Sequence, residues 1–142
     1  MQKYSRQREA IVQYLTGRTD HPSAEMVYHA LRQTYPNISL GTVYRNLSLL
    51  EENGQLMKIP MDGESDRFDP NVKPHYHFVC RKCGCVQDVP MTLLDSLNQL
   101  AQAHINGLVE SHMLVFKGIC KDCEKQSACE TSQTSSQISN QK

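Results

Sequence analysis

Residues 39–50, SLGTVYRNLSLL, decide the fold of the N-terminal half of the chain. Apolar side chains recur there at helical spacing, which predicts an amphipathic helix with an inward stripe of Leu40, Val43, Leu47 and Leu50. Ser39 is expected to cap the start of this helix, and Gly54 stands where a left-handed residue would end it. The stretch therefore has one face for a core and one polar face.

The polar face carries side chains that are typical of DNA recognition. Arginine and asparagine pair bidentately with guanine and adenine, while serine, threonine and tyrosine commonly bind phosphate. Because they fall off the apolar stripe, these residues are expected to reach outward: Thr42, Tyr44, Arg45, Asn46 and Ser48. Most polar helix faces are simply solvated, so the helix alone makes DNA binding the minority interpretation.

The flanking segments predict a winged helix. A first helix is expected to begin at Ser5 and stop at Gly17, and a second to follow Ser23 and end at Pro36. After the third helix, QLMKIPM and DRFD resemble two short strands joined by the turn DGES. Three helices followed by a hairpin predict a winged helix-turn-helix DNA-binding domain over residues 1–70, with the third helix in the major groove.

The pattern changes after this domain. Strand-like runs HYHFVC, CVQDV and HMLVFKGIC are interrupted by one expected helix over residues 92–104. Its inward side chains are predicted to be Leu93, Leu94, Leu97, Leu100 and Ala101. We therefore predict an α+β chain with a second, α/β domain over residues 71–125. Residues 126–142 are rich in serine, threonine and glutamine and are expected to be disordered.

Four cysteines are arranged as two CxxC pairs, the second reading CKDC at the end of the last predicted strand. Four thiolates at this spacing predict a closed, tetrahedral structural zinc site formed by Cys80, Cys83, Cys120 and Cys123. A redox dithiol is the competing interpretation, but such a CxxC would open a helix, and both pairs here are expected at strand ends. Cys85 and Cys129 are left over, as a small core residue and a tail thiol.

Histidines and carboxylates form a second group of metal-binding side chains. His75 and His77 are two positions apart on a predicted strand, so both should leave the same face. Asp69 precedes them, Asp88 lies on the next strand, and His21 lies between the first two helices. Nitrogen and oxygen ligands without thiolate favour Fe²⁺, Mn²⁺ or Zn²⁺. If His21 takes part, the metal crosslinks the two domains.

Composition narrows the setting of the protein. The chain has 142 residues, 39% of them hydrophobic, and zero formal net charge, which suits one compact domain or two small ones. No stretch has the run of about 18 apolar residues that a membrane span needs, so a cytoplasmic protein is expected. In that reducing compartment, six cysteines argue for metal binding rather than for disulfides.

Together these motifs resemble the ferric uptake regulator (Fur) family of bacterial metal-dependent repressors. The resemblance rests on DHPSAEMVY, LGTVYRNLSLL, RFDP, HYHFVCRKCG, VQDV and GICKDC, and it extends to about residue 125. It implies a homodimer that binds palindromic double-stranded DNA operators and dimerises through its C-terminal domain. It also implies structural zinc on the four paired cysteines and a regulatory Fe²⁺ or Mn²⁺ held by His21, Asp69, His75, His77 and Asp88.

The two aspartates make the chain most similar to the PerR-type peroxide sensors, because iron-uptake regulators typically have glutamate at those positions. That similarity implies sensing of hydrogen peroxide by oxidation of the ligands His21 and His75. The chain departs from the family pattern at Pro74 and Tyr76, where members with an additional metal site carry ligands. Asp95 and His112 could be remnants of that site, and we predict that it is not functional.

Other functions stay open at this stage. A regulator of iron, manganese or zinc homeostasis would have the same motifs. A metallo-hydrolase or deaminase would need an open metal beside a general base, and the H-x-E…P-C-x-x-C signature is absent, so we expect no enzyme. A zinc-stapled interaction module would explain the cysteines but would leave His21, Asp69 and Asp88 without a role.

Overall fold

The computed structural model describes residues 2–126, in which the chain divides into two compact units. Unit 1 is Met1–Lys73 and unit 2 begins at Pro74. The tail predicted to be disordered, apart from its first residue, lies outside the described residues. None of the described helices is long and apolar enough to cross a membrane.

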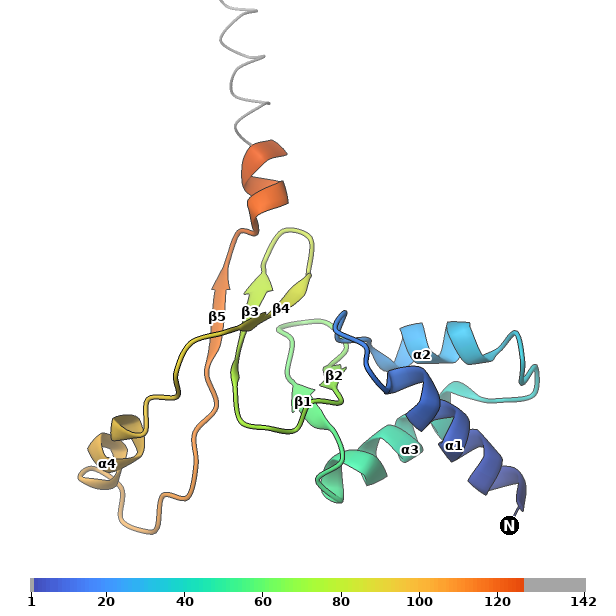
Figure 1. Cartoon of the computed structure of the whole chain (residues 1–142), viewed down its shortest axis with the longest axis horizontal. Helices are drawn as coiled ribbons and strands as arrows, with labels where there is room; N and C mark the ends of the chain where they lie inside the picture. Colours follow the sequence, from blue (N-terminus) through green and yellow to red (C-terminus); the bar gives the residue numbers. More distant parts are fainter. Residues whose placement is uncertain (1, 127–142) are drawn as a thin grey trace, which may run out of the picture. The chain divides into compact units, whose positions relative to one another are not determined.

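Unit 1 begins with three helices (Figure 1): α1 Gln2–Leu15, α2 Ala24–Leu31 and α3 Leu40–Glu52. They pack around a shared apolar core whose fully buried members include Ile11, Leu15, Val27, Val43 and Leu47. The predicted start of the first helix at Ser5 is wrong, because α1 already begins at Gln2. Its predicted end is confirmed, since Gly17 follows the helix with a φ of 76°.

A serine caps each of the next two helices, as predicted for Ser39, and α2 ends at Leu31, before the predicted end at Pro36. Ser23 Oγ accepts a hydrogen bond from Met26 N at 3.3 Å, and Ser39 Oγ accepts one from Thr42 N at 3.1 Å. Each bond satisfies one of the backbone N–H groups that a helix start leaves without an intrahelical partner. Gly54 follows α3 with a φ of 75°, a conformation that glycine adopts without steric cost.

The predicted wing is present as an antiparallel hairpin of β1 Met57–Ile59 and β2 Arg67–Asp69. Phe68 of β2 is buried in the helical core. The same residue donates a backbone hydrogen bond from its N–H to Pro22 O at 3.0 Å. The wing is therefore fixed to the segment that leads into α2.

Unit 2 contains a three-stranded sheet, β3 Tyr76–Cys80, β4 Val86–Val89 and β5 Val115–Gly118, in the order β4-β3-β5. Strands β3 and β4 pair antiparallel, whereas β3 and β5 pair parallel. A parallel pair needs a long crossover connection, and α4 Ser96–Gln102 lies within it. A last helix starts at Lys121 and continues to the end of the described residues.

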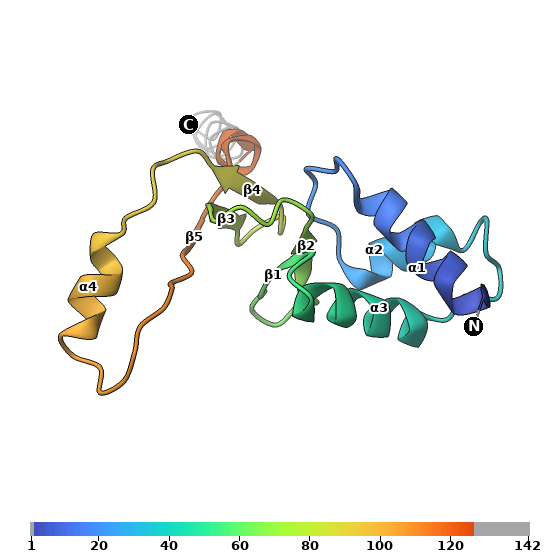
Figure 2. The same cartoon turned by 60° about the horizontal axis from the view of Figure 1, so that its bottom comes forward.

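The predicted burial of α4 is wrong. The helix is shorter than expected, none of its residues is buried, and 65% of Leu100 is exposed. Figures 1 and 2 both show α4 at the far end of two extended segments that lead away from the sheet. Helical spacing of leucines predicts an apolar face, but it does not say whether the same chain supplies the surface that covers that face.

Candidate metal sites and nucleic-acid interface

The four paired cysteines come together at one end of the sheet of unit 2. Cys80 ends β3, Cys83 lies in the following turn, and Cys120 and Cys123 stand at the start of the last helix. The four sulfur atoms all lie within 4.8 Å of one another, and Cys83 Sγ is 3.7 Å from Cys120 Sγ. Zinc–sulfur bonds of about 2.3 Å place the sulfurs of a tetrahedral site about 3.8 Å apart. The cluster therefore fits zinc.

Backbone N–H groups prepare this cluster for a cation. Hydrogen bonds from Cys83 N at 3.5 Å and Cys120 N at 3.3 Å lower the pKa of Cys80 to about 5. The N–H of Cys123 likewise lowers the pKa of Cys120. The pKa of Cys123 is raised to about 12, chiefly by its hydrogen bond with Cys120. Backbone N–H groups thus favour the deprotonated form of Cys80 and Cys120, and a bound cation would favour the deprotonated form of the other two cysteines.

The second CxxC differs from the prediction in one respect. Cys120 and Cys123 open a helix, whereas both pairs were expected at strand ends. The redox interpretation gains nothing from this, because both sulfurs lie inside the four-sulfur cluster. Cys85, predicted to be a small core residue, is only half-buried against the cluster, and burial raises its pKa to about 12. Cys129 lies outside the described residues.

Two of the predicted regulatory ligands meet within unit 1. His21 Nε2 lies 3.1 Å from Asp69 Oδ2, and only 2% and 3% of these side chains are exposed. His21 has a φ of 52°, which non-glycine residues seldom adopt, and Arg67 Nη1 donates to its carbonyl oxygen at 3.2 Å. Asp69 Oδ1 accepts from Asn71 N at 2.9 Å. We call His21 and Asp69 the first half-site.

The other three predicted ligands meet within unit 2. His75 Nε2 and His77 Nε2 lie 2.9 and 3.3 Å from the same oxygen, Asp88 Oδ1. The prediction that both histidines leave one face of the strand is confirmed, since their rings are 4.4 Å apart and His77 pairs with Asp88 across β3 and β4. We call His75, His77 and Asp88 the second half-site. Both half-sites hold only imidazole and carboxylate, which suits Fe²⁺, Mn²⁺ or Zn²⁺.

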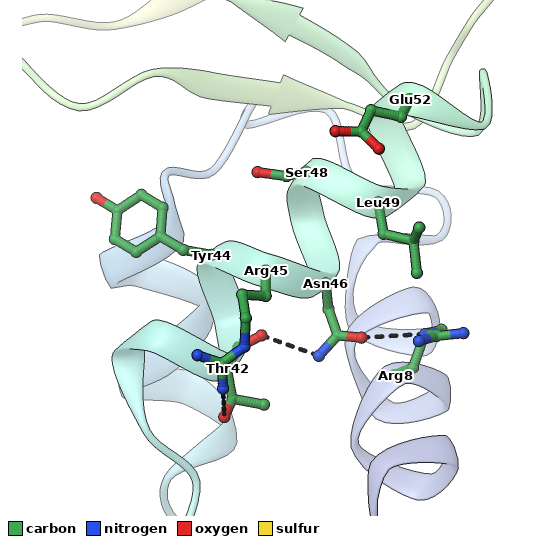
Figure 3. A pocket seen from close by; sticks show the side chains of 8 residues that line it. All are labelled: Arg8, Thr42, Tyr44, Arg45, Asn46, Ser48, Leu49 and Glu52. Atoms are coloured by element: carbon green, nitrogen blue, oxygen red, sulfur yellow. Dashed lines mark hydrogen bonds between the residues drawn. The ribbon is translucent and has the colours of Figure 1, made fainter.

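The polar face of α3 is narrower than the sequence predicted. Tyr44 and Arg45 are exposed, but Thr42 and Asn46 are buried, with exposed fractions of 8% and 7%. The expectation that Thr42 and Asn46 reach outward is therefore wrong. Asn46 lies against α1, whose Arg8 contacts it (Figure 3), whereas Thr42 is hydrogen-bonded to Ser39 and Arg45 near it on the chain.

An open groove of about 500 Å³ runs beside α3 and is lined by α1 and α3. Arg8 of α1 points across it (Figure 3), and its Nε donates to Asn46 Oδ1 at 3.0 Å. Asn46 Nδ2 donates to Thr42 O at 2.9 Å, and Arg45 Nη2 donates to Thr42 Oγ1 at 3.1 Å. The sequence did not identify Arg8, whose only signal is an exposed basic side chain on the first helix.

Tyr44 links α3 to α2 and to the wing. Its hydroxyl donates to Glu25 Oε1 at 2.6 Å, and the hydroxyl of Ser65 donates to the same oxygen at 2.8 Å. The hydrogen bond from Tyr44 lowers the pKa of Glu25, and the carboxylate in turn raises the pKa of Tyr44. The three residues bring the turn of the wing, α2 and α3 into one hydrogen-bonded cluster.

Residues 1–117 match the model of the ferric uptake regulator family. This chain belongs to that family. The peroxide-responsive repressor PerR of Staphylococcus epidermidis is 38% identical over 84% of this chain and 80% of its own length. The peroxide operon regulator of Bacillus subtilis is 40% identical over 84% of this chain and 82% of its own length.

Solved structures of the family share the fold. The Campylobacter jejuni peroxide stress regulator is similar with a TM-score of 0.65 and 31% identity, over 86% of this chain and 92% of the other. The Helicobacter pylori ferric uptake regulator gives a TM-score of 0.71 and 26% identity, over 84% of this chain and 80% of the other. The predicted α+β fold, with a winged helix first and the dimerisation domain of the family second, is thereby confirmed.

The Helicobacter pylori family member has three functional metal-binding sites. In this chain Tyr76, where we predicted the loss of an additional site, takes part in a hydrogen-bond chain. Its hydroxyl accepts from Leu94 N at 2.8 Å and lies 2.6 Å from His112 Nε2. His112 Nδ1 lies 2.7 Å from Asn98 Oδ1. The amide oxygen only accepts, so Nδ1 carries the proton and Nε2 accepts from Tyr76.

Proposed function

We propose that this member of the ferric uptake regulator family is a peroxide-responsive, metal-dependent repressor. It binds palindromic operator DNA as a homodimer and acts in the cytoplasm as a regulator, without catalytic turnover. One observation carries the proposal: each unit holds one imidazole–carboxylate half-site, and the carboxylate is aspartate in both. Peroxide-responsive relatives at 38% and 40% identity support the choice of signal.

Helix α3 is the recognition helix in this proposal. Tyr44 and Arg45 are exposed next to the groove, as are Ser48 and Glu52, and we assign Tyr44 and Arg45 to contacts with bases and phosphates in the major groove. The buried Thr42 and Asn46 position arginines instead of contacting DNA, since Thr42 accepts a hydrogen bond from Arg45 and Asn46 accepts one from Arg8. The formal net charge of the chain is zero, so attraction to DNA has to come from such local clusters.

The zinc site stabilises unit 2. The buried core cluster of this unit consists of Cys80, Cys120 and Cys123, with only a few partly buried side chains packed on it. A core of that size cannot offset the conformational entropy of the unit, and small domains then need a metal or a partner. Zinc on Cys80, Cys83, Cys120 and Cys123 supplies the first of these.

A second copy of the chain supplies the partner. Unit 2 exposes large apolar side chains: Met91, Leu94, Leu100, Ile105, Leu108, Met113 and Phe116. Two of them flank or lie on β5, an edge strand of the sheet among the described residues. An exposed apolar edge strand is a template for pairing with another strand. We assign this surface to the homodimer interface.

One regulatory metal ion is shared by the two half-sites. Two ligands from unit 1 and three from unit 2 are each too few for a six-coordinate ion, whereas His21, Asp69, His75, His77 and Asp88 together leave one position for a small molecule. A metal ion that joins the two ligand groups would fix the orientation of each winged helix. A two-fold dimer needs a fixed orientation, because the two halves of a palindromic operator are spaced by about 34 Å per helical turn of DNA.

Hydrogen peroxide releases the repressor by changing the ligands. Bound Fe²⁺ would catalyse the reaction of peroxide with a ligand ring, and Mn²⁺ would do so far less readily. His21 or His75 gains one oxygen atom on its ring, the second peroxide oxygen leaves as water, and the ring is oxidised by two electrons. An oxidised imidazole is a weaker ligand, so the half-sites separate. The alternative is a regulator of iron, manganese or zinc supply, which the same donor set would serve.

The test is anaerobic DNA binding with operator duplex selected by the protein from a random pool. The zinc-loaded dimer should bind specifically only when Fe²⁺ or Mn²⁺ is added, and peroxide should release the iron form but not the manganese form. Equal affinity with and without Fe²⁺ or Mn²⁺ would refute the repressor model. Equal response of both metal forms to peroxide would favour metal homeostasis.

A further inference from the structure

The side chain of Arg8 is held in place by a buried amide. Asn46 uses both ends of its side chain: Oδ1 accepts from Arg8 Nε at 3.0 Å and Nδ2 donates to Thr42 O at 2.9 Å. Only 7% of Asn46 is exposed, so its rotamer is fixed by packing as well as by hydrogen bonds. The guanidinium of Arg8 is therefore oriented by α3 although it belongs to α1 (Figure 3).

We infer that Arg8 binds a backbone phosphate of the operator and that Asn46 positions it for this contact. The inference rests on the proposed DNA binding and adds a residue from outside the recognition helix. It also changes the role of Asn46 from base reader to positioning residue. Arg8 is exposed, and its Nε is the nitrogen that Asn46 engages.

The remaining donors of Arg8 suit phosphate. With Nε bound, the two Nη nitrogens form a planar fork, which matches two oxygens of one phosphate group. Within the described residues no hydrogen bond or ion pair joins these nitrogens to an acidic side chain, although Glu52 also lines the groove. An anchored fork loses less side-chain entropy on binding than a mobile arginine does.

The position of Arg8 favours the DNA backbone over the base edges. The groove places Arg8 beside α3, whose own exposed residues are the ones expected to enter the major groove. In helix-turn-helix proteins the helix that precedes the recognition helix crosses the phosphate backbone, and we infer the same kind of contact for α1, which also lies beside α3. A contact to phosphate positions the domain and adds affinity, but it carries no sequence information.

The test is the salt dependence of binding by the full-length, zinc- and manganese-loaded dimer. Each phosphate contact contributes about 0.9 to the slope of log affinity against log salt, so Arg8→Ala should lower the slope by about 2 per dimer. Affinity should fall on the order of tenfold, equally for the selected operator and a scrambled duplex. Arg6→Ala removes the same charge from an exposed position of α1 outside the groove, and its slope should match the wild type.

A double-mutant cycle tests the role of Asn46. Asn46→Ala should weaken binding in the wild type but cost at most about twofold more once Arg8→Ala is present. Full additivity, an unchanged slope for Arg8→Ala, or an equal drop for Arg6→Ala would each overturn the inference. Failure of the wild type itself to bind DNA with metal would instead refute the proposed function, and the inference with it.

Discussion

His21 and Asp69 are 48 positions apart, yet His21 Nε2 lies 3.1 Å from Asp69 Oδ2 in the interior of unit 1. The wing brings them together, because β2 pairs with the segment before α2 through the bridge of Ser23 with Arg67. The hairpin that completes the DNA-binding unit thus also assembles its metal half-site. In the proposed function, regulation and DNA binding therefore depend on one structural element.

Asp69→Asn should abolish tight Mn²⁺ binding at the regulatory site, with affinity at least about tenfold weaker. The amide keeps the size of the side chain but loses the negative charge that a divalent cation requires. Titration of the zinc-loaded dimer with Mn²⁺, followed by electron paramagnetic resonance, measures this. Asp20→Asn is the matched control, since Asp20 forms an exposed ion pair with Arg18 and should leave Mn²⁺ binding intact. Unchanged affinity of Asp69→Asn would exclude unit 1 from the site.

Cys83→Ser should lose the zinc and with it the fold of unit 2, because four-thiolate binding contributes on the order of 10 kcal/mol. Metal content and light scattering should report a zinc-free, monomeric or aggregated protein. Cys85→Ser should retain one zinc per chain and the dimer, since Cys85 only packs beside the cluster. A zinc-loaded Cys83→Ser dimer would mean that Cys85 can replace Cys83 and that the four-cysteine assignment is incomplete.

Tyr76→Phe should destabilise unit 2 by about 1–3 kcal/mol. The change leaves Leu94 N and His112 Nε2 without the hydroxyl that each contacts at 2.8 and 2.6 Å. Denaturant unfolding of the zinc-loaded dimer gives the magnitude, and amide exchange at Leu94 gives the location. Tyr28→Phe serves as control, because no hydrogen bond of its hydroxyl occurs in the described part of the chain. A similar loss of stability in both variants would show that the hydrogen bonds of Tyr76 do not stabilise unit 2.

The stabilisation from Glu25 should depend on pH. The hydrogen bond from Tyr44 lowers the pKa of Glu25 below its ordinary 4.5, so the folded state favours the carboxylate. The contribution is complete above about pH 4.5 and is lost as the pH falls through the lower, folded value. Wild type should exceed Glu25→Gln in stability by less than about 1 kcal/mol at neutral pH, with the gap closing in acid. Tyr44→Phe should narrow the same gap, and a gap that widens in acid would reverse the assignment.

Brief exposure of the iron form to hydrogen peroxide should add one oxygen to peptides that contain His21 or His75. Mass spectrometry of the digested protein detects the added oxygen, and the manganese form should show none. The four zinc-binding cysteines should remain reduced during the same pulse, because coordination by zinc slows their oxidation. Release from DNA accompanied by cysteine oxidation alone would place the sensor in the thiol cluster.

Much of this protein followed from the sequence because the signals are local. Ser39 caps α3 through a residue three positions ahead, and Gly17 and Gly54 follow α1 and α3 with the positive φ that glycine adopts without cost. The candidate ligand residues were also identifiable, since the chemistry of histidine, aspartate and paired cysteines does not depend on the fold. Alternation along the chain was enough to place His77 of β3 and His75, the residue before β3, on one side, where both contact Asp88.

Tertiary structure alone decided what covers each surface. Thr42 and Asn46 were predicted to be exposed from their spacing, but both are buried, and Asn46 supports Arg8 of α1. The leucines of α4 looked buried, but the described chain provides no surface to cover them, as the 65% exposure of Leu100 records. Helical periodicity specifies which side chains share a face, whereas burial depends on a neighbour that is distant in sequence or belongs to another molecule.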